Sequence, residues 1–289
     1  MNKGLVGMGV VGGVIALGLG GQAFASRAAA KEVDEVIESV SEFVDIDYQK
    51  VHASLLGRGT WIKDIVVSPV ASSEQYRIDE LVMYEYADEE DVPTYLNLAV
   101  HGMQLGSTAL GENAETLKSL GYSEAPAVDV RVEYRYEAAD QSVRLEKFEL
   151  GAEDMGRLAV SLHLSNAAWD ESTLQSLPFS LIPVQFNDAE IVYSDDSFVQ
   201  RMFDTTAAGS GKSVKQVKQD WIAGLTADPA MTELFEPAQI KEIEKFIDNP
   251  DRFSISFSPE QPISFGNLIV VEGAEDSMFK RLNIRFKAN

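Results

Sequence analysis

Hydrophobic and polar residues alternate through most of the chain after residue 45, which is the pattern of strands with one apolar face. The clearest case is residues 128–136 (VDVRVEYRY), where valine and tyrosine alternate with charged residues. Residues 142–150 and 157–164 continue the alternation and are joined by short polar turns. The pattern predicts an antiparallel sheet with one covered face and one face in water.

The period becomes helical after Ser194. Three amphipathic segments follow, with Ser213 as a suitable N-cap of the second and Pro237 in the first turn of the third. Strand patterns return at residues 253–257 and 282–286. We therefore predict an α+β fold, in which helices inserted near residues 195–249 pack over an antiparallel sheet.

The same patterns divide the chain into consecutive regions. We expect a transmembrane anchor or signal peptide at 1–26, an amphipathic helix at 27–44, a sheet region at 45–193, a helical insertion at 194–250 and C-terminal strands at 251–289.

The N-terminal apolar run has two interpretations. Lys3 precedes 23 uncharged residues, and roughly 20 suffice for a helix that crosses a membrane. The small residues Ala23 and Ala25 also fit cleavage after Ala25 by a signal peptidase. The helical pattern that continues past residue 26 favours an uncut transmembrane helix. Its apolar side chains are those of Leu5, Val10, Val11, Val14, Ile15, Leu17 and Leu19.

Both interpretations place the body of the protein outside the cytoplasm, because short N-terminal tails that carry a lysine stay inside. We expect an inner-membrane protein with a periplasmic body, or a soluble periplasmic protein if the chain is cut. The net charge of −22 disfavours nucleic acid as a partner. The chain has no cysteine, which excludes disulfides and thiolate chemistry.

Motifs that carry chemistry are weak. The GSGKS segment at 209–213 has Thr206 where a phosphate-binding loop needs glycine, so a capped helix start is the better interpretation. His52, His101 and His163 lie far apart and show no metal-ligand spacing. The four acids at 88–91 lack the alternation and the glycine of a calcium loop. We therefore predict no catalytic residue, no metal and no cofactor.

Aromatic side chains on the predicted sheet and helices suggest a different kind of site. They form either an ordinary core or a groove for an apolar ligand between sheet and helices. The candidate ligand-binding residues are Trp61, Tyr84, Tyr134, Tyr136, Trp221 and Phe246.

The chain also resembles a group of bacterial envelope proteins. Residues 46–69, 145–166 and 253–269 are similar in hydrophobic pattern and turn placement to AsmA-like and YdgA-like (DUF945) proteins. The resemblance implies a curved antiparallel sheet that faces the periplasm, and a role in lipid handling or envelope maintenance. It carries no catalytic motif.

Our leading hypothesis is a membrane-tethered periplasmic protein without enzymatic activity that binds a lipid. The alternative is an accessory factor that binds another envelope protein through its acidic surface. A hydrolase built from scattered carboxylates is the third hypothesis.

Overall fold

The structure is a computed structural model that describes most of the chain beyond residue 32. It covers residues 33–289 except 35–36, 39–40, 54–58, 71–74, 90–91, 105–109, 111–112, 123–125, 169–180 and 270–277. The chain forms two compact units. The N-terminal unit contains residues up to Arg135 together with 148–153, and the C-terminal unit contains 136–147 and 154–289.

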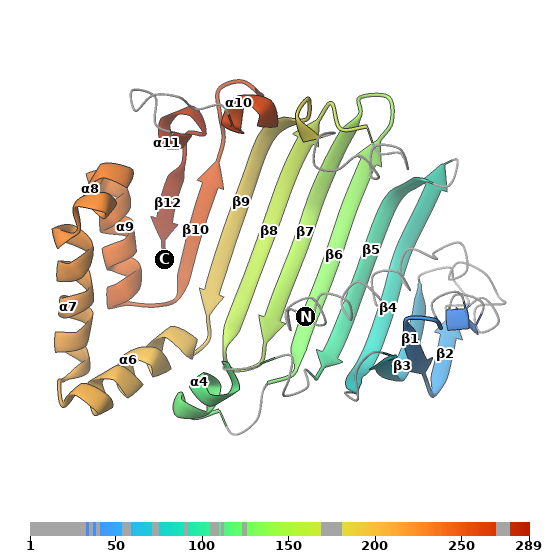
Figure 1. Ribbon diagram of the computed structural model, residues 1–289, viewed down its shortest axis with the longest axis horizontal. Coiled ribbons are helices and arrows are strands. Elements are labelled where there is room, and N and C mark those ends of the chain that lie inside the picture. Colours follow the sequence, from blue (N-terminus) through green and yellow to red (C-terminus); the bar gives the residue numbers. More distant parts are fainter. Residues whose placement is uncertain are drawn as a thin grey trace. The chain divides into compact units, whose positions relative to one another are not determined.

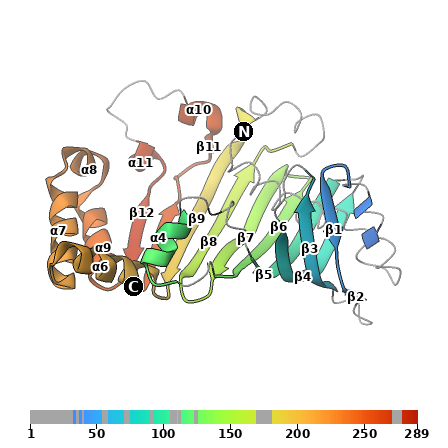
Figure 2. The ribbon, with the colours of Figure 1, turned by 60° about the horizontal axis from the view of Figure 1, so that its bottom comes forward.

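The N-terminal unit is an antiparallel sheet. Both β1 and β2 pair with β3, which is followed in the sheet by β4, β5 and β6 (Figure 2). Its elements are β1 (Val44–Asp47), β2 (Lys50–Ala53), β3 (Thr60–Pro69), β4 (Tyr76–Glu89), β5 (Val92–Met103), α4 (Asn113–Ser119) and β6 (Val128–Glu137).

One face of this sheet carries the core of the N-terminal unit. Alternate residues of β3, β4 and β5 are almost fully buried, and Val33 of the preceding helical segment packs with them. The largest of these buried side chains are Ile62, Ile65, Tyr76, Ile78, Leu81, Leu96 and Leu98. Full burial of such side chains stabilises the fold by roughly 1.5–3 kcal/mol each.

The strands of the C-terminal unit are also antiparallel. Among them, β8 pairs with β9, β9 with β10 and β10 with β12, while β11 pairs with the start of β9. Its strands and two short helices are β7 (Ser142–Ala152, partly in this unit), β8 (Gly156–Ser165), β9 (Gln185–Asp195), β10 (Arg252–Phe257), β11 (Ile263–Ser264), α10 (Phe265–Ile269), α11 (Met278–Arg281) and β12 (Arg285–Ala288).

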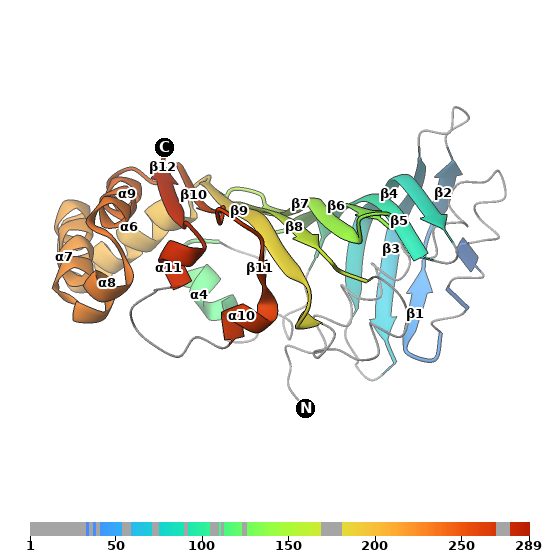
Figure 3. The same ribbon diagram turned by 90° about the horizontal axis from the view of Figure 1, so that it is seen from above.

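Four helices lie between β9 and β10 in the sequence and gather next to β10 and β12 (Figures 1 and 3). They are α6 (Phe198–Ser210), α7 (Val214–Ala227), α8 (Pro229–Leu234) and α9 (Pro237–Asp248). They share a small core of their own, centred on Phe203, Ala207, Val217 and Ile247. Of these helices, α9 packs on β12.

The predicted α+β class is wrong. The described part of the chain is mostly antiparallel sheet, with strands as long as the 14 residues of β4. Helical periodicity in residues 198–248 suggested a layer of helices over the sheet. The apolar side chains of α6 and α7 instead pack largely against each other. These two helices therefore do not form a second layer over the sheet.

The predicted transmembrane helix at 1–26 and its apolar residues lie outside the described residues. Among the described residues, no helix has the length and apolar character needed to span a bilayer. In the predicted amphipathic segment 27–44, residues 33–34 and 37–38 are helical and 44 begins β1. Val33 is fully buried there, which shows that this segment contributes to the core.

Candidate functional site

Strands β8, β9 and β10 form an amphipathic sheet in the C-terminal unit. Val160 of β8 lies opposite Ile191 of β9, which lies opposite Ile255 of β10. Because side chains alternate between the faces of a strand, every second residue joins this apolar row. We call the resulting surface the apolar lane. It consists of Leu158, Val160, Leu162, Leu164, Phe186, Ala189, Ile191, Tyr193, Phe253, Ile255 and Phe257.

The lane is only partly covered. Except for Phe186, all of its side chains remain partly exposed to solvent. In the N-terminal unit, the corresponding leucines Leu81, Leu96 and Leu98 are 0%, 2% and 2% exposed. The strands of the two units therefore carry the same apolar pattern, but the apolar face is buried as a core in the N-terminal unit and only partly covered in the C-terminal one.

Aromatic contacts close the two ends of the lane. At one end, Phe246 of α9 meets Tyr193 edge-on, with ring centroids 6.1 Å apart, and lies 5.4 Å from Phe253. At the other end, Phe186 meets Phe257 edge-on at 6.4 Å. The aliphatic side chains lie between these two aromatic groups. Because Phe246 belongs to the helices and the others to the sheet, one end of the lane is where the helices meet the strands.

The opposite face of the same strands is polar. His163 Nδ1 lies 3.2 Å from Asp188 Oδ2, and the Asn187 side-chain amide donates to Ser165 Oγ at 3.0 Å. Ordinary alternation along β8 places His163 and Ser165 on this side, and the register shift after His163 places Phe186 instead of Asn187 opposite Leu164. Such contacts are common on a solvated sheet face. These polar groups lie outside the lane, whose own side chains are uncharged.

The structure separates the predicted ligand-binding residues of the N-terminal unit. Trp61 pairs with Val82 on the face opposite the core residue Ile62. Tyr84 is 38% exposed at a register shift between Met83 and Glu85. Tyr134 packs instead in the core, where burial raises its pKa above the usual range for tyrosine. Trp61 and Tyr84 therefore cannot share a groove with Tyr134, because the sheet lies between them.

A network of aromatic and charged side chains occupies the outer face on which Tyr84 lies. The Arg131 guanidinium sits over the Tyr84 ring at 5.4 Å, and that of Arg135 over Tyr95 at 4.6 Å. The Tyr95 hydroxyl donates to Glu133 Oε1 at 2.8 Å, and burial together with this bond raises the pKa of Tyr95. Paired cations and aromatic rings of this kind stabilise a solvated sheet face.

The other predicted residues lie in the C-terminal unit. Trp221 is 44% exposed on α7 and meets Phe203 edge-on at 5.3 Å. Tyr136 lies at the end of β6 and is partly exposed. Of the six predicted residues, Phe246 is the one that the structure places at the lane. The aliphatic residues of the lane were missed, although the alternation in RLAVSLHLS (157–165) already shows them.

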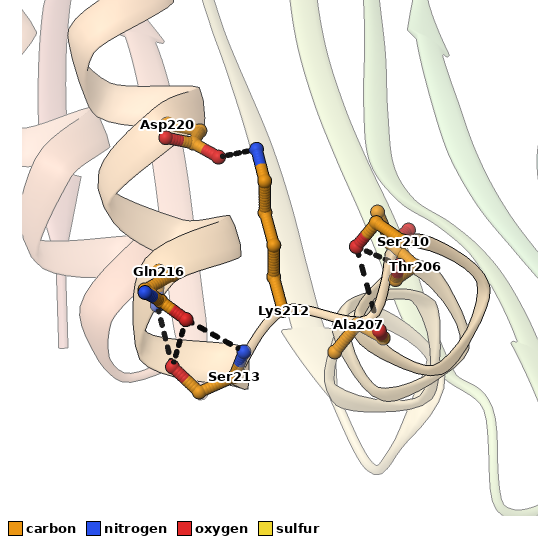
Figure 4. A network of polar contacts seen from close by, with 7 residues as sticks. All are labelled: Thr206, Ala207, Ser210, Lys212, Ser213, Gln216 and Asp220. Carbon is orange, nitrogen blue, oxygen red and sulfur yellow. Dashed lines mark hydrogen bonds and ion pairs between the residues drawn. The ribbon is translucent and has the colours of Figure 1, made fainter.

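The GSGKS segment is a helix junction (Figure 4). Gly211 ends α6 with φ of 68°, and the Ser213 hydroxyl accepts from the Gln216 backbone N–H in a capping box. Lys212 Nζ is 2.7 Å from Asp220 Oδ2, so its charge is already paired. The predicted N-cap at Ser213 is confirmed, and the segment serves to start α7.

In the part of the chain that the structure describes, no group of three histidine or carboxylate side chains is placed to hold a metal ion. His101 and His163 each face one aspartate, Asp129 and Asp188 respectively. Each pair belongs to a different unit.

Comparison with protein families finds a match for about the C-terminal half of the chain. A family model described as "Uncharacterized protein" matches residues 149–289. The match begins within β7 and includes the whole lane and the helices α6–α9. No curated protein matches the chain.

Proposed function

We propose that this protein binds the acyl chain of a lipid along the apolar lane and acts as a lipid-handling protein without enzymatic activity. The observation that supports the proposal is the partial exposure of a continuous apolar face in the C-terminal unit. Contiguous exposed apolar surface on a soluble body marks a binding site more often than scattered apolar residues do.

Energetics favour a lipid as the occupant. Hydrocarbon leaves water with a gain of ~0.8 kcal/mol per methylene, but moving it from a bilayer to an apolar protein surface changes little. An acyl chain can therefore move between a membrane and the lane at little cost in free energy, provided that it is not exposed to water on the way. This is the property that a protein that holds or carries lipids needs.

The N-terminal run adds a location to the proposal. The apolar run at 4–26 suits export. We propose a periplasmic body that takes lipid from the adjacent membrane. The resemblance to AsmA-like and YdgA-like envelope proteins agrees with this role.

A lipid extraction experiment with two matched variants tests the proposal. The full chain is purified, and its bound lipid is extracted and quantified per chain by mass spectrometry. Leu162→Glu places a charge in the lane, whereas Ala159→Glu places the same charge on the opposite face of β8. We expect lipid with the wild-type protein and with Ala159→Glu, and its loss with Leu162→Glu.

Circular dichroism checks that both variants retain the fold. The proposal fails if the wild-type protein carries no lipid, or if the two variants lose lipid equally. Protein partners that co-purify while lipid is absent would favour the alternative of an accessory factor that binds an envelope protein.

A further inference from the structure

We infer that the lane holds one acyl chain of the length found in ordinary membrane lipids, under a head group without net negative charge. This inference rests on the proposed function and adds the class of lipid to it. It follows from the length of the lane, from a small side chain on its middle strand and from the charges around it.

The length follows from the strand geometry. Leu158 and Leu164 stand at the two aromatic ends of the lane, opposite Tyr193 and Phe186. The six residue steps between them span ~20 Å at ~3.3 Å per residue. A bilayer core of ~30 Å contains two opposed chains, so one membrane acyl chain occupies ~15 Å, or more when it is extended. The length of the lane therefore matches that of a single acyl chain that lies along the strands.

Ala189 lies on β9, the middle strand of the lane. It lies between Leu162 of β8 and Phe257 of β10, so a methyl group stands between two large apolar side chains. At the neighbouring row the central residue is the bulkier Ile191. Ala189 is therefore the position where an extended chain can approach the sheet most closely.

Charge selects the head group. The lane itself carries no charged side chain, and its Tyr193 end is bordered by Asp195, whose Oδ1 accepts from the Tyr193 hydroxyl at 2.7 Å. The whole chain has a net charge of −22. An anionic head group is repelled by these carboxylates, whereas a zwitterionic head group is not.

A competition from vesicles tests the length. Phosphatidylcholine vesicles contain equal amounts of saturated lysophosphatidylcholines of roughly 10 to 22 carbons, with lysophosphatidylglycerols of the same lengths, and protein freed of lipid is incubated with them. The protein is then separated, and bound lipids are quantified relative to the vesicles. We expect binding that changes little with length up to roughly 16–18 carbons and a decline of up to about fourfold per methylene beyond that length, because each surplus methylene is left in water.

We also expect the phosphocholine lipids to exceed the phosphoglycerol lipids at every length. Ala189→Trp should shift the start of this decline to shorter chains or abolish binding, whereas Ala159→Trp on the opposite face should leave the profile unchanged. Binding that rises steadily with length, or that favours the anionic series, overturns this inference while the proposed function stands. An absence of any bound lipid in the wild-type protein overturns the proposed function itself.

Discussion

Two leucine truncations distinguish a buried face from an open one. Leu98 lies in the middle of β5 in the N-terminal core and is 2% exposed, whereas Leu162 lies in the middle of β8 in the lane and is partly exposed. Leu98→Ala removes buried methyl groups and leaves a cavity, so we expect it to lower the free energy of unfolding by roughly 2–5 kcal/mol. Leu162→Ala leaves no closed cavity, because solvent already reaches the side chain.

Loss of partly buried apolar area alone gives about 1 kcal/mol for Leu162→Ala. The predicted difference between the two variants is therefore at least about 1 kcal/mol, and it reflects the partial exposure of the lane side chains.

Urea unfolding measures the two values. To report on each unit by itself, each variant is followed by a tryptophan in its own unit, Trp61 for the N-terminal unit and Trp221 for the C-terminal one. Trp169, which lies outside the described residues, is replaced by phenylalanine in all proteins. A loss for Leu162→Ala as large as that for Leu98→Ala would refute the reasoning, since it would mean that protein covers the lane.

Three further predictions concern single contacts. Burial and a hydrogen bond to Asp34 raise the pKa of Tyr48 to about 12, above the ordinary tyrosine value of about 10, so its contribution to stability is complete below pH ~10 and is lost as the pH rises towards 12. Tyr48→Phe should remove this part of the alkaline unfolding profile, and an unchanged profile would contradict the assignment. The Ala288 backbone N–H donates to Glu242 and lowers its pKa, so the tie between α9 and β12 should weaken only as acid protonates Glu242. In Glu242→Gln, hydrogen exchange at Ala288 should lose this pH dependence. Ser213→Ala should lower the free energy of unfolding of the C-terminal unit by ~1 kcal/mol in urea, and a neutral effect would mean that the cap is not formed.

Local patterns in the sequence predict several elements well. The alternation at 128–136 corresponds to β6, and that at 157–164 corresponds to β8. The serine N-cap and the glycine before it correspond to the junction of α6 and α7. These features depend on neighbouring residues along the chain, so one sequence is enough to find them.

Whether the apolar face of a strand is buried depends on segments that are distant in the sequence. A local pattern therefore does not reveal it. The segments of β5 and β8 both alternate, yet the leucines of β5 are buried and those of β8 are partly exposed. The same limit explains why the predicted fold class was wrong. Amphipathic helices can bury their apolar faces against each other as readily as against a sheet. The period of the hydrophobic pattern does not predict which element the apolar face of a helix will pack against.

The candidate site was missed because aromatic residues were given more weight than aliphatic ones. Trp61 and Tyr134 occupy opposite faces of one sheet, which only the pairing of strands reveals. The leucines of β8 alternate with other residues in the same way as the leucines of a buried strand do. Their role becomes apparent only when their exposure is compared with that of the buried leucines in the N-terminal unit.

Spin labels on adjacent residues of β8 give the most direct test of the lane. The chain has no cysteine, so Val160→Cys and Ser161→Cys each carry a single label, on the lane and on the opposite face respectively. Both labels should be accessible to a water-soluble paramagnetic reagent in the protein freed of lipid. After incubation with phosphatidylcholine vesicles and removal of the vesicles, the account predicts that the label at 160 is shielded and immobilised while the label at 161 is unchanged. A label at 160 that is shielded before any lipid is added, or equal changes at both positions, would contradict it.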